Sequence, residues 1–212
     1  NNIISYNISQ NDGRINSGAG IWAWNCGSGI NNSEIYNNIV FMGPSATGSP
    51  AAIDFISPTN NLHVRNNIFI TTDGLRIVDA VGGQTGLLFQ GNSYWSSGAT
   101  PRFMWGGTNY SSLNAWRTAT GQERLNGSDT GFDVDPRLNN PGGGGTLNDT
   151  GLLTTLNAYR LQPSSPLIDR AINLLTQFSI NPGPRDFFGN SIPQGGGYGI
   201  GAFDTTSGVP TP

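Results

Sequence analysis

The chain has 212 residues, a formal net charge of −3 and only 11% charged residues. This length favours a single domain, and the low charge argues against a helical bundle. We expect no nucleic-acid surface, which needs clustered cations, and no membrane span, which needs roughly 20 apolar residues in a row. All 10 basic residues are arginine, which excludes a catalytic lysine. The single cysteine, Cys26, allows no internal disulfide and is predicted to be a small buried residue.

A loose repeat runs through the first half of the chain. Asn2, Asn38, Asn67 and Asn92 are separated by 36, 29 and 25 residues. Two sets of short strands are expected, one just before the last three of these asparagines (33–36, 62–65 and 87–90) and one midway between the motifs (21–24, 53–55 and 75–77). Clusters of Gly, Pro, Ser and Asn separate the strands.

The recurrence of asparagine at one point of each repeat favours a parallel β-helix. In such a solenoid the coils stack at roughly 4.8 Å, so equivalent asparagines can hydrogen-bond to one another as an amide ladder. A β-sandwich or jelly roll is the alternative for short strands at irregular spacing, but it gives no reason for the recurrence. We therefore predict an all-β parallel β-helix in which Asn38 and Asn67 stack in successive turns.

The chain divides into three regions. Residues 1–105 are expected to form the coils of the β-helix. Residues 106–158 contain a short predicted helix at 112–121, with a serine at its N-cap and a glycine at its C-terminal end, and then a loop-rich connection. Residues 159–212 have short segments interrupted by proline and are expected to form a C-terminal cap over the last coil, with a tail from residue 205.

One candidate binding face lies on the midway strands. If Ile21, Ile53 and Leu75 point inward, their neighbours point outward. The predicted substrate-binding side chains on this outward face are Trp22, Trp24, Asp54 and Arg76. Aromatic faces stack on sugar rings, and aspartate and arginine bind hydroxyls or carboxylates. The alternative is that a loop over residues 10–18 covers the two tryptophans as a small secondary core.

A second candidate lies on the strands that precede the asparagines. Glu34 and His63 are predicted to share an outward column on adjacent coils, with Cα atoms about 5 Å apart. There they form a potential acid–base pair; the alternative is an exposed ion pair of little energetic value. Arg65 is expected in the neighbouring outward column. Hydrolysis by two carboxylates, Glu34 and Asp54, would require a separation of roughly 5–10 Å.

A third candidate is a metal site in the loop-rich connection. Asp129, Asp133 and Asp135 alternate along the chain, and alternate aspartates can converge on a hard cation such as Ca²⁺. The segment lacks the pattern of an EF-hand loop. The alternative is that these aspartates form hydrogen bonds within turns.

Four motifs in the C-terminal half carry a family resemblance. They are DPRL at 135–138, YRLQPSSPLID at 159–169, RDFFGN at 185–190 and GIGAFD at 199–204. Together with the coils they resemble secreted bacterial right-handed parallel β-helix proteins, the pectate-lyase-like superfamily. The resemblance implies a right-handed solenoid that is secreted or lies on the cell surface. It specifies architecture more than function, because the superfamily includes lyases, hydrolases, epimerases and adhesins.

The resemblance also implies the candidate functions. Superfamily lyases remove a proton beside a uronate carboxylate with lysine or arginine as base, so the candidates here are Arg65 and Arg76. The Gly-His-Gly segment of polygalacturonase-like hydrolases is absent, since His63 has no flanking glycine. We expect a polysaccharide-active or polysaccharide-binding protein; a non-catalytic structural or adhesion module of a bacterial surface is the alternative. The strand-like start predicts an upstream β-helix portion of the same precursor as a partner.

Overall fold

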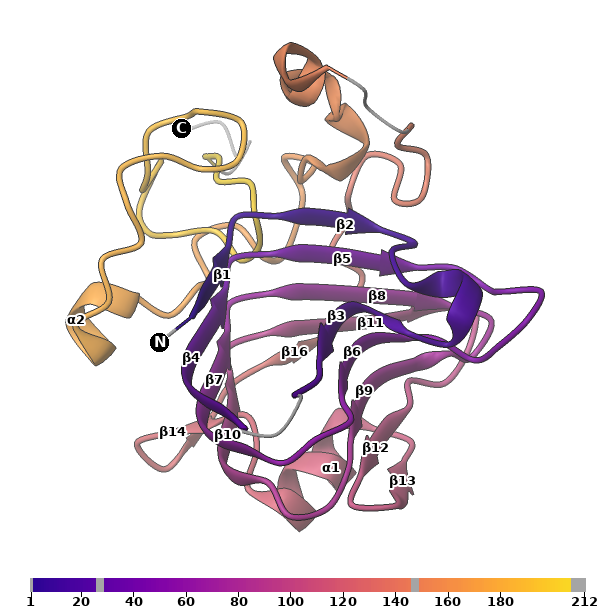
Figure 1. Cartoon of the computed structure of the whole chain (residues 1–212). Coiled ribbons are helices and arrows are strands. Elements are labelled where there is room, and N and C mark those ends of the chain that lie inside the picture. Colours follow the sequence, from indigo (N-terminus) through magenta and orange to yellow (C-terminus); the bar gives the residue numbers. More distant parts are fainter. Residues whose placement is uncertain (1, 26–28, 146–148, 207–212) are drawn as a thin grey trace.

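The computed structural model of the protein describes residues 2–25, 29–145 and 149–206. Its core is a parallel β-solenoid of about three turns, in which successive turns add strands to three sheets (Figure 1). The parallel pairing of each repeat with the next confirms the predicted fold class and excludes the sandwich. The handedness stays a prediction. Cys26 and the end of the predicted tail lie outside the described residues.

The strands form three stacked sheets, named here in chain order. The first sheet contains β1 (Ile3–Ser5), β4 (Ile30–Tyr36), β7 (Thr59–Arg65) and β10 (Thr85–Gln90). The second contains β2 (Ile8–Gln10), β5 (Ile39–Met42), β8 (Ile68–Thr72), β11 (Ser93–Ser97) and β16 (Phe132–Asp133). The third contains β3 (Ala19–Ala23), β6 (Ala51–Phe55), β9 (Arg76–Ala80), β12 (Phe103–Trp105) and the antiparallel β13 (Thr108–Tyr110). A separate hairpin pairs β14 (Arg124–Leu125) with β15 (Ser128–Asp129).

A residue in the left-handed conformation turns the chain from the first sheet to the second in each coil. The φ angle is 52° at Tyr6, 53° at Asn37, 53° at Asn66 and 71° at Gly91. Asparagine and glycine adopt positive φ more readily than other residues. This requirement explains Asn37 and Asn66, the first residues of the two Asn-Asn pairs at this turn.

The second asparagine of each pair forms the predicted amide ladder. Asn38 donates to Asn67 Oδ1 through both its side-chain Nδ2 (2.8 Å) and its backbone N–H (2.9 Å). Asn67 donates in the same two ways to Asn92 Oδ1, both at 2.9 Å. The first member of the ladder is Asn7. The predicted first member, Asn2, was wrong because it precedes β1, whereas every ladder residue follows a first-sheet strand.

Glu123 ends the ladder beyond Asn92, its last asparagine. Its carboxylate accepts from Asn92 Nδ2 (2.7 Å), the Asn92 N–H (3.2 Å), the Tyr94 hydroxyl (2.6 Å), the Gly91 N–H (2.6 Å) and the Thr130 hydroxyl (2.9 Å). A carboxylate only accepts hydrogen bonds, so it can receive all of these donors at once. Burial raises the pKa of Glu123, and the hydrogen bonds it accepts oppose that shift.

A helix closes the apolar interior at the same end. α1 (Leu113–Thr120) begins after its N-cap Ser112 and ends at Gly121, as predicted. It places Trp116, which is fully buried, against the interior of the last coil. The rings around Trp116 are those of Phe89, Tyr94, Phe103 and Trp105. The aromatic cluster fills the space that a further coil would otherwise occupy.

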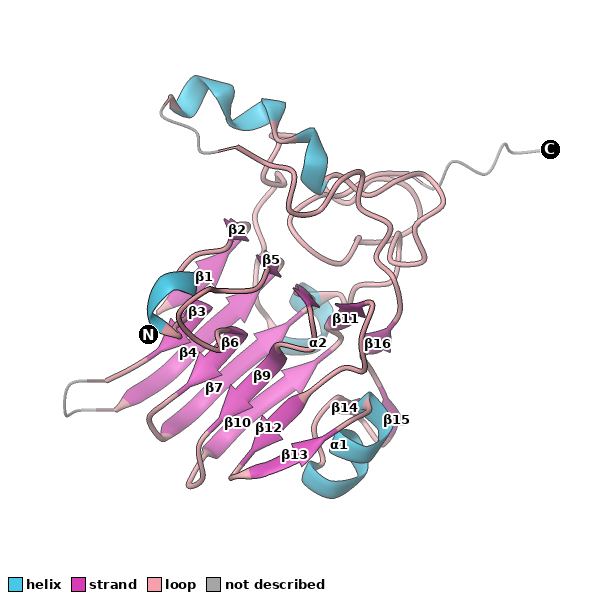
Figure 2. Ribbon diagram, turned by 90° about the vertical axis from the view of Figure 1, so that its right-hand side faces the viewer, coloured by secondary structure: helices cyan, strands magenta, loops and turns pink. Residues whose placement is uncertain are grey.

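The C-terminal segment, named here for its described residues 134–145 and 149–206, lies along the flank of the coils (Figure 2). It contains η2 (Thr150–Thr155), η3 (Asn157–Tyr159) and α2 (Leu174–Phe178). The remaining short helix, η1 (Arg14–Asn16), lies in the first coil between β2 and β3. The C-terminal segment also carries apolar residues that face the coils. Its apolar residues cover the outward side of the second sheet in one cluster that includes Ile39, Ile68, Ile70, Leu161, Leu167, Ile200 and Phe203. The predicted position over the last coil was therefore wrong: α1 closes that end, and the C-terminal segment covers a sheet face.

We expect Glu123→Gln to lower the free energy of unfolding by about 1–3 kcal/mol. The N–H groups of the new side-chain amide would face the N–H and hydroxyl donors that now bond to the Glu123 carboxylate, so some of these donors would lose their acceptor. Urea denaturation followed by circular dichroism measures the change. Asp73→Asn is the control because Asp73 is exposed on a turn, and we expect a smaller loss there. An unchanged midpoint for Glu123→Gln would contradict the assigned role.

Candidate functional site

Two tryptophans are exposed on the outward face of the third sheet. Trp22 on β3 and Trp24 just after it are 50% and 58% exposed. Their rings stack on each other with a centroid distance of 5.8 Å and an interplanar angle of 20°. These exposures overturn the alternative in which the loop at residues 10–18 buries the pair. The outward orientation predicted from the alternation of the strand is retained.

Two aspartates continue the column of Trp22. The parallel register places Trp22 opposite Asp54, and Asp54 opposite Asp79. The three side chains therefore share one column, with a step of roughly 4.8 Å from strand to strand. Ile56 and Val81, which directly follow β6 and β9, are 37% and 38% exposed. They add an apolar border to the column of carboxylates.

Asp54 has unusual surroundings for a carboxylate. The residue is only 7% exposed, yet among the described residues no hydrogen bond or ion pair reaches its side chain. Burial raises the pKa of Asp54 to about 6, Asp79 adds to this shift, and Arg76 opposes it. Asp54 therefore holds a proton at a pH where an ordinary aspartate has lost it.

Arg76 begins β9 and is not opposite Asp54, as the sequence predicted, but is aligned with a residue three positions earlier. It is aligned with Ala51, and its guanidinium forms an ion pair with Asp79 and donates to the Ser49 carbonyl at 2.7 Å. Its Nε is buried without a hydrogen-bond partner. The structure thus brings together the four predicted binding residues, Trp22, Trp24, Asp54 and Arg76, and adds Asp79 to them.

Asp79 was missed because the sequence alignment of the third-sheet strands was wrong. The prediction placed Leu75 opposite Ile53, whereas the structure places Val78 there. Leu75 precedes β9 and is buried outside the strand. A sequence signal for the true register existed: Ile53–Phe55 and Val78–Ala80 both carry an aspartate between two apolar residues.

The second predicted site lies on the first sheet, where Glu34 links two basic side chains. Glu34 Oε1 is 2.7 Å from His63 Nδ1, and Glu34 Oε2 accepts from Arg65 Nη1 at 2.5 Å. The structure therefore brings Glu34, His63 and Arg65 together. The side chains of Glu34 and His63 are 22% and 18% exposed, so the pair is within reach of solvent.

Arg65 differs from its two partners because it faces protein. The residue is 3% exposed, and its Nε donates to Gln90 Oε1 at 2.9 Å. Its guanidinium lies 3.8 Å from the ring centre of Phe178 in α2. Burial lowers the pKa of Arg65, and Glu34 opposes that shift. Through these contacts Arg65 holds the C-terminal segment against the first sheet. Arg65 is therefore poorly placed to contact a substrate.

The three aspartates predicted to bind Ca²⁺ lie in different surroundings. Asp129 forms ion pairs with Arg117 (3.4 Å) and Arg124 (3.3 Å). Asp133 lies on β16 opposite Tyr94, and Asp135 accepts from the Arg137 N–H at 2.8 Å. In the part of the chain that the structure describes, no group of three or more His, Cys, Asp or Glu side chains is arranged to hold a metal ion.

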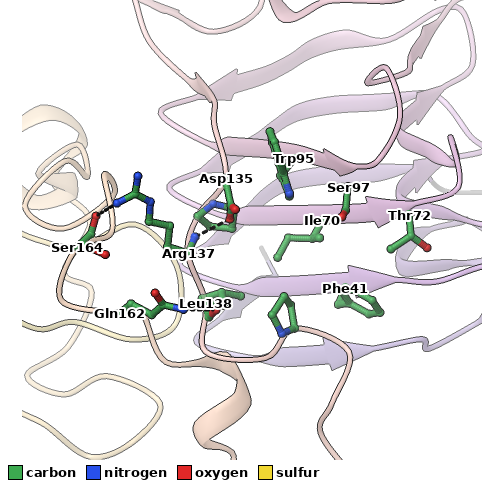
Figure 3. A pocket seen from close by; sticks show the side chains of 12 residues that line it. Phe41, Ile70, Thr72, Trp95, Ser97, Asp135, Arg137, Leu138, Gln162 and Ser164 are labelled. Atoms are coloured by element: carbon green, nitrogen blue, oxygen red, sulfur yellow. Dashed lines mark hydrogen bonds between the residues drawn. The ribbon is translucent and has the colours of Figure 1, made fainter.

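A groove that the sequence did not predict lies between the second sheet and the C-terminal segment (Figure 3). Its volume is about 460 Å³. The side chains that line it include Phe41, Ile70, Trp95, Asp135, Arg137, Gln162 and Ser164. Arg137 donates to the Ser164 carbonyl at 3.0 Å, so the groove joins two of the C-terminal motifs. Nothing in the sequence indicated that these motifs would meet over β8 and β11.

Comparisons with known protein families, with curated proteins and with solved structures gave no match. In the described part of the chain, no helix has the length and apolar character needed to cross a membrane. The resemblance carried by the C-terminal motifs therefore rests on the sequence alone.

We expect Asp54→Asn to change the pH dependence of stability. Because the pKa of Asp54 rises from 3.8 to about 6 on folding, the folded protein keeps a proton that the unfolded chain releases. Stability contributed by this group therefore falls as the pH rises from about 4 to about 6. The variant lacks this loss, so we expect it to be more stable than the parent at neutral pH by on the order of 1 kcal/mol.

Thermal unfolding between pH 4 and 8 measures this difference. Asp73→Asn is the control, because Asp73 is exposed on a turn, and its curve is expected to follow that of the parent. Parallel curves for the parent and Asp54→Asn would show that Asp54 titrates normally.

Proposed function

We propose that this protein binds an extracellular polysaccharide along the outward face of the third sheet. The observation that carries the proposal is the stacked, exposed pair Trp22–Trp24 beside the unpartnered carboxylate of Asp54. Aromatic faces stack on sugar rings, and carboxylates accept hydrogen bonds from hydroxyls. The columns repeat at roughly 4.8 Å, close to the length of one sugar unit, so the face suits a polymer.

The charges on this face favour a neutral polysaccharide over a polyuronate. Asp54 and Asp79 lie side by side, and Arg76, the cation next to them, is already paired with Asp79. A uronate carboxylate placed here would meet like charges without a free cation to neutralise it. This argues against the arginine-dependent lyase chemistry that the family resemblance allows.

The C-terminal motifs support a position outside the cell. Their resemblance to secreted bacterial β-helix proteins of the pectate-lyase-like superfamily agrees with a polymer ligand that is too large to enter a closed pocket. An adhesion or structural module of a bacterial surface is the alternative from the same resemblance. Only the polysaccharide-binding hypothesis predicts that soluble glycans bind to the outward face of the third sheet, where Trp22 and Trp24 lie.

Glycoside hydrolysis is a second candidate function, and the contrast between Asp54 and Asp79 favours it. Asp54 has its pKa raised to about 6, while Asp79 is ion-paired with Arg76. Retaining glycosidases use two carboxyl groups roughly 5–5.5 Å apart, one as acid and one as nucleophile. Aspartates on adjacent strands of one column are compatible with that separation.

The chemistry would use Asp54 as the acid and Asp79 as the nucleophile. Asp54 donates its proton to the glycosidic oxygen as the bond from that oxygen to the anomeric carbon breaks, and an Asp79 oxygen bonds to the same carbon. Water then displaces Asp79 from the anomeric carbon and returns a proton to Asp54. Each cycle consumes one water and restores both carboxyl groups.

Binding is tested with the variants Trp22→Ala and Trp24→Ala. We expect each to weaken binding of soluble neutral glucans, xylans or mannans by at least about tenfold, or about 1.4 kcal/mol, in affinity electrophoresis and calorimetry. Leu88→Ala is the matched control, because Leu88 is an exposed apolar residue on the first sheet. Equal affinities in all variants, or binding of polygalacturonate alone, would contradict the proposal. No glycan binding at all would favour the adhesion alternative.

Hydrolysis is tested by measuring new reducing ends from the same neutral polysaccharides. We expect Asp54→Asn and Asp79→Asn each to lower turnover by at least about a hundredfold, with folding checked by circular dichroism. His63→Ala should leave turnover unchanged, since His63 lies on another sheet. Loss of turnover in His63→Ala alone would move the chemistry to the Glu34–His63 pair.

A further inference from the structure

The two ends of the solenoid are finished differently. At one end α1 covers the interior with Trp116, and Glu123 accepts the last rung of the ladder. At the other end β1, β2 and β3 are each the outermost strand of their sheet. Each therefore presents one edge whose backbone groups pair with no strand among the described residues. Unpaired edges of this kind are templates for a further strand.

The amide ladder also stops short at this end. Each later ladder oxygen, such as Asn38 Oδ1 or Asn67 Oδ1, accepts a backbone N–H and a side-chain N–H from the preceding coil. Asn7 Oδ1 accepts no hydrogen bond from any described residue. Its amide nitrogen already donates to Asn38 and to the Ser5 carbonyl. Asn7 Oδ1 is therefore placed to accept the two N–H groups of an asparagine in a preceding coil.

The apolar interior is open at the same end. Ile4 belongs to the inward column of Ile35 and Val64, but it is 39% exposed, whereas Val64 is fully buried. Ile3 beside it is 64% exposed. A hollow of about 570 Å³ is lined by Ile4 and Val40 together with Asn7 and its neighbours. Backbone edges, ladder acceptor and exposed isoleucines thus coincide on one surface.

We propose that this end, formed by β1, β2 and β3, is a docking surface for one further β-coil supplied by polypeptide outside residues 1–212. The surface continues the coil-on-coil interface of β1 with β4, so it fits a coil in parallel register that carries an asparagine at the ladder position. A second copy of this chain fits less well. Its own last coil is closed by α1, and two open ends facing each other would set Asn7 against Asn7.

A fused coil tests this proposal. A copy of residues 32–60 placed directly before residue 1 puts the copied Asn38 29 residues ahead of Asn7, the separation of Asn38 from Asn67. We expect a higher thermal midpoint than for the 212-residue chain. We also expect at least about tenfold slower hydrogen exchange at the β1 and β3 amides, because these edges become paired.

The matched control is the same fusion with the copied Asn38→Ala, which removes only the new rung. We expect it to retain part of the exchange protection and to lose part of the gain in thermal midpoint. A fused copy that is cleaved by protease as an unfolded tail, with an unchanged midpoint, would overturn the proposal. A stable dimer of the 212-residue chain with protected β1 and β3 amides would overturn it in favour of a second copy.

Discussion

The amide ladder between the first and second sheets is the constraint on which the other features depend. Each ladder asparagine bonds to the next coil and also to the sharp turn in which it lies. Asn67 Nδ2, for example, donates to the Ile35 carbonyl (3.0 Å) and the Arg65 carbonyl (2.9 Å) as well as to Asn92. A slip of one residue would break these bonds and exchange inward and outward side chains along the strands. The ladder therefore fixes the register of each coil.

A fixed register determines what each outward face can present. The second-sheet face is covered by the apolar residues of the C-terminal segment. The first-sheet face is partly used for the same attachment, through Arg65 and Phe178. The third-sheet face keeps its exposed tryptophans and the aligned pair Asp54 and Asp79. The groove on the second-sheet face also has aromatic side chains and a carboxylate, but in the described structure the stacked, exposed tryptophan pair and the two aligned aspartates lie on the third-sheet face.

The sequence predicted the features that repeat locally. The ladder at Asn38, Asn67 and Asn92 follows from residues at one point of each repeat, and the α1 boundaries follow from ordinary capping residues. The errors arose where register or distant packing decides. Leu75 was taken as the inward residue in place of Val78, although the aspartate between two apolar residues at 53–55 and 78–80 marked the true register, so Asp79 was missed. The place of the C-terminal segment depends on contacts more than a hundred residues apart, such as Asn66 with Ile172.

Two buried carboxylates show how structural and functional roles separate. Glu123 and Asp54 are both removed from water, at 0% and 7% exposure. Glu123 accepts hydrogen bonds from the ladder and its neighbours, which compensate the loss of hydration. Asp54 receives no such bond and lies next to a second carboxylate, so it destabilises the fold when ionised. Uncompensated carboxylates of this kind gather at functional sites, and Asp54 lies beside the exposed tryptophans. The loss of stability on ionisation and the position beside the exposed tryptophans therefore both identify Asp54 as a candidate functional residue.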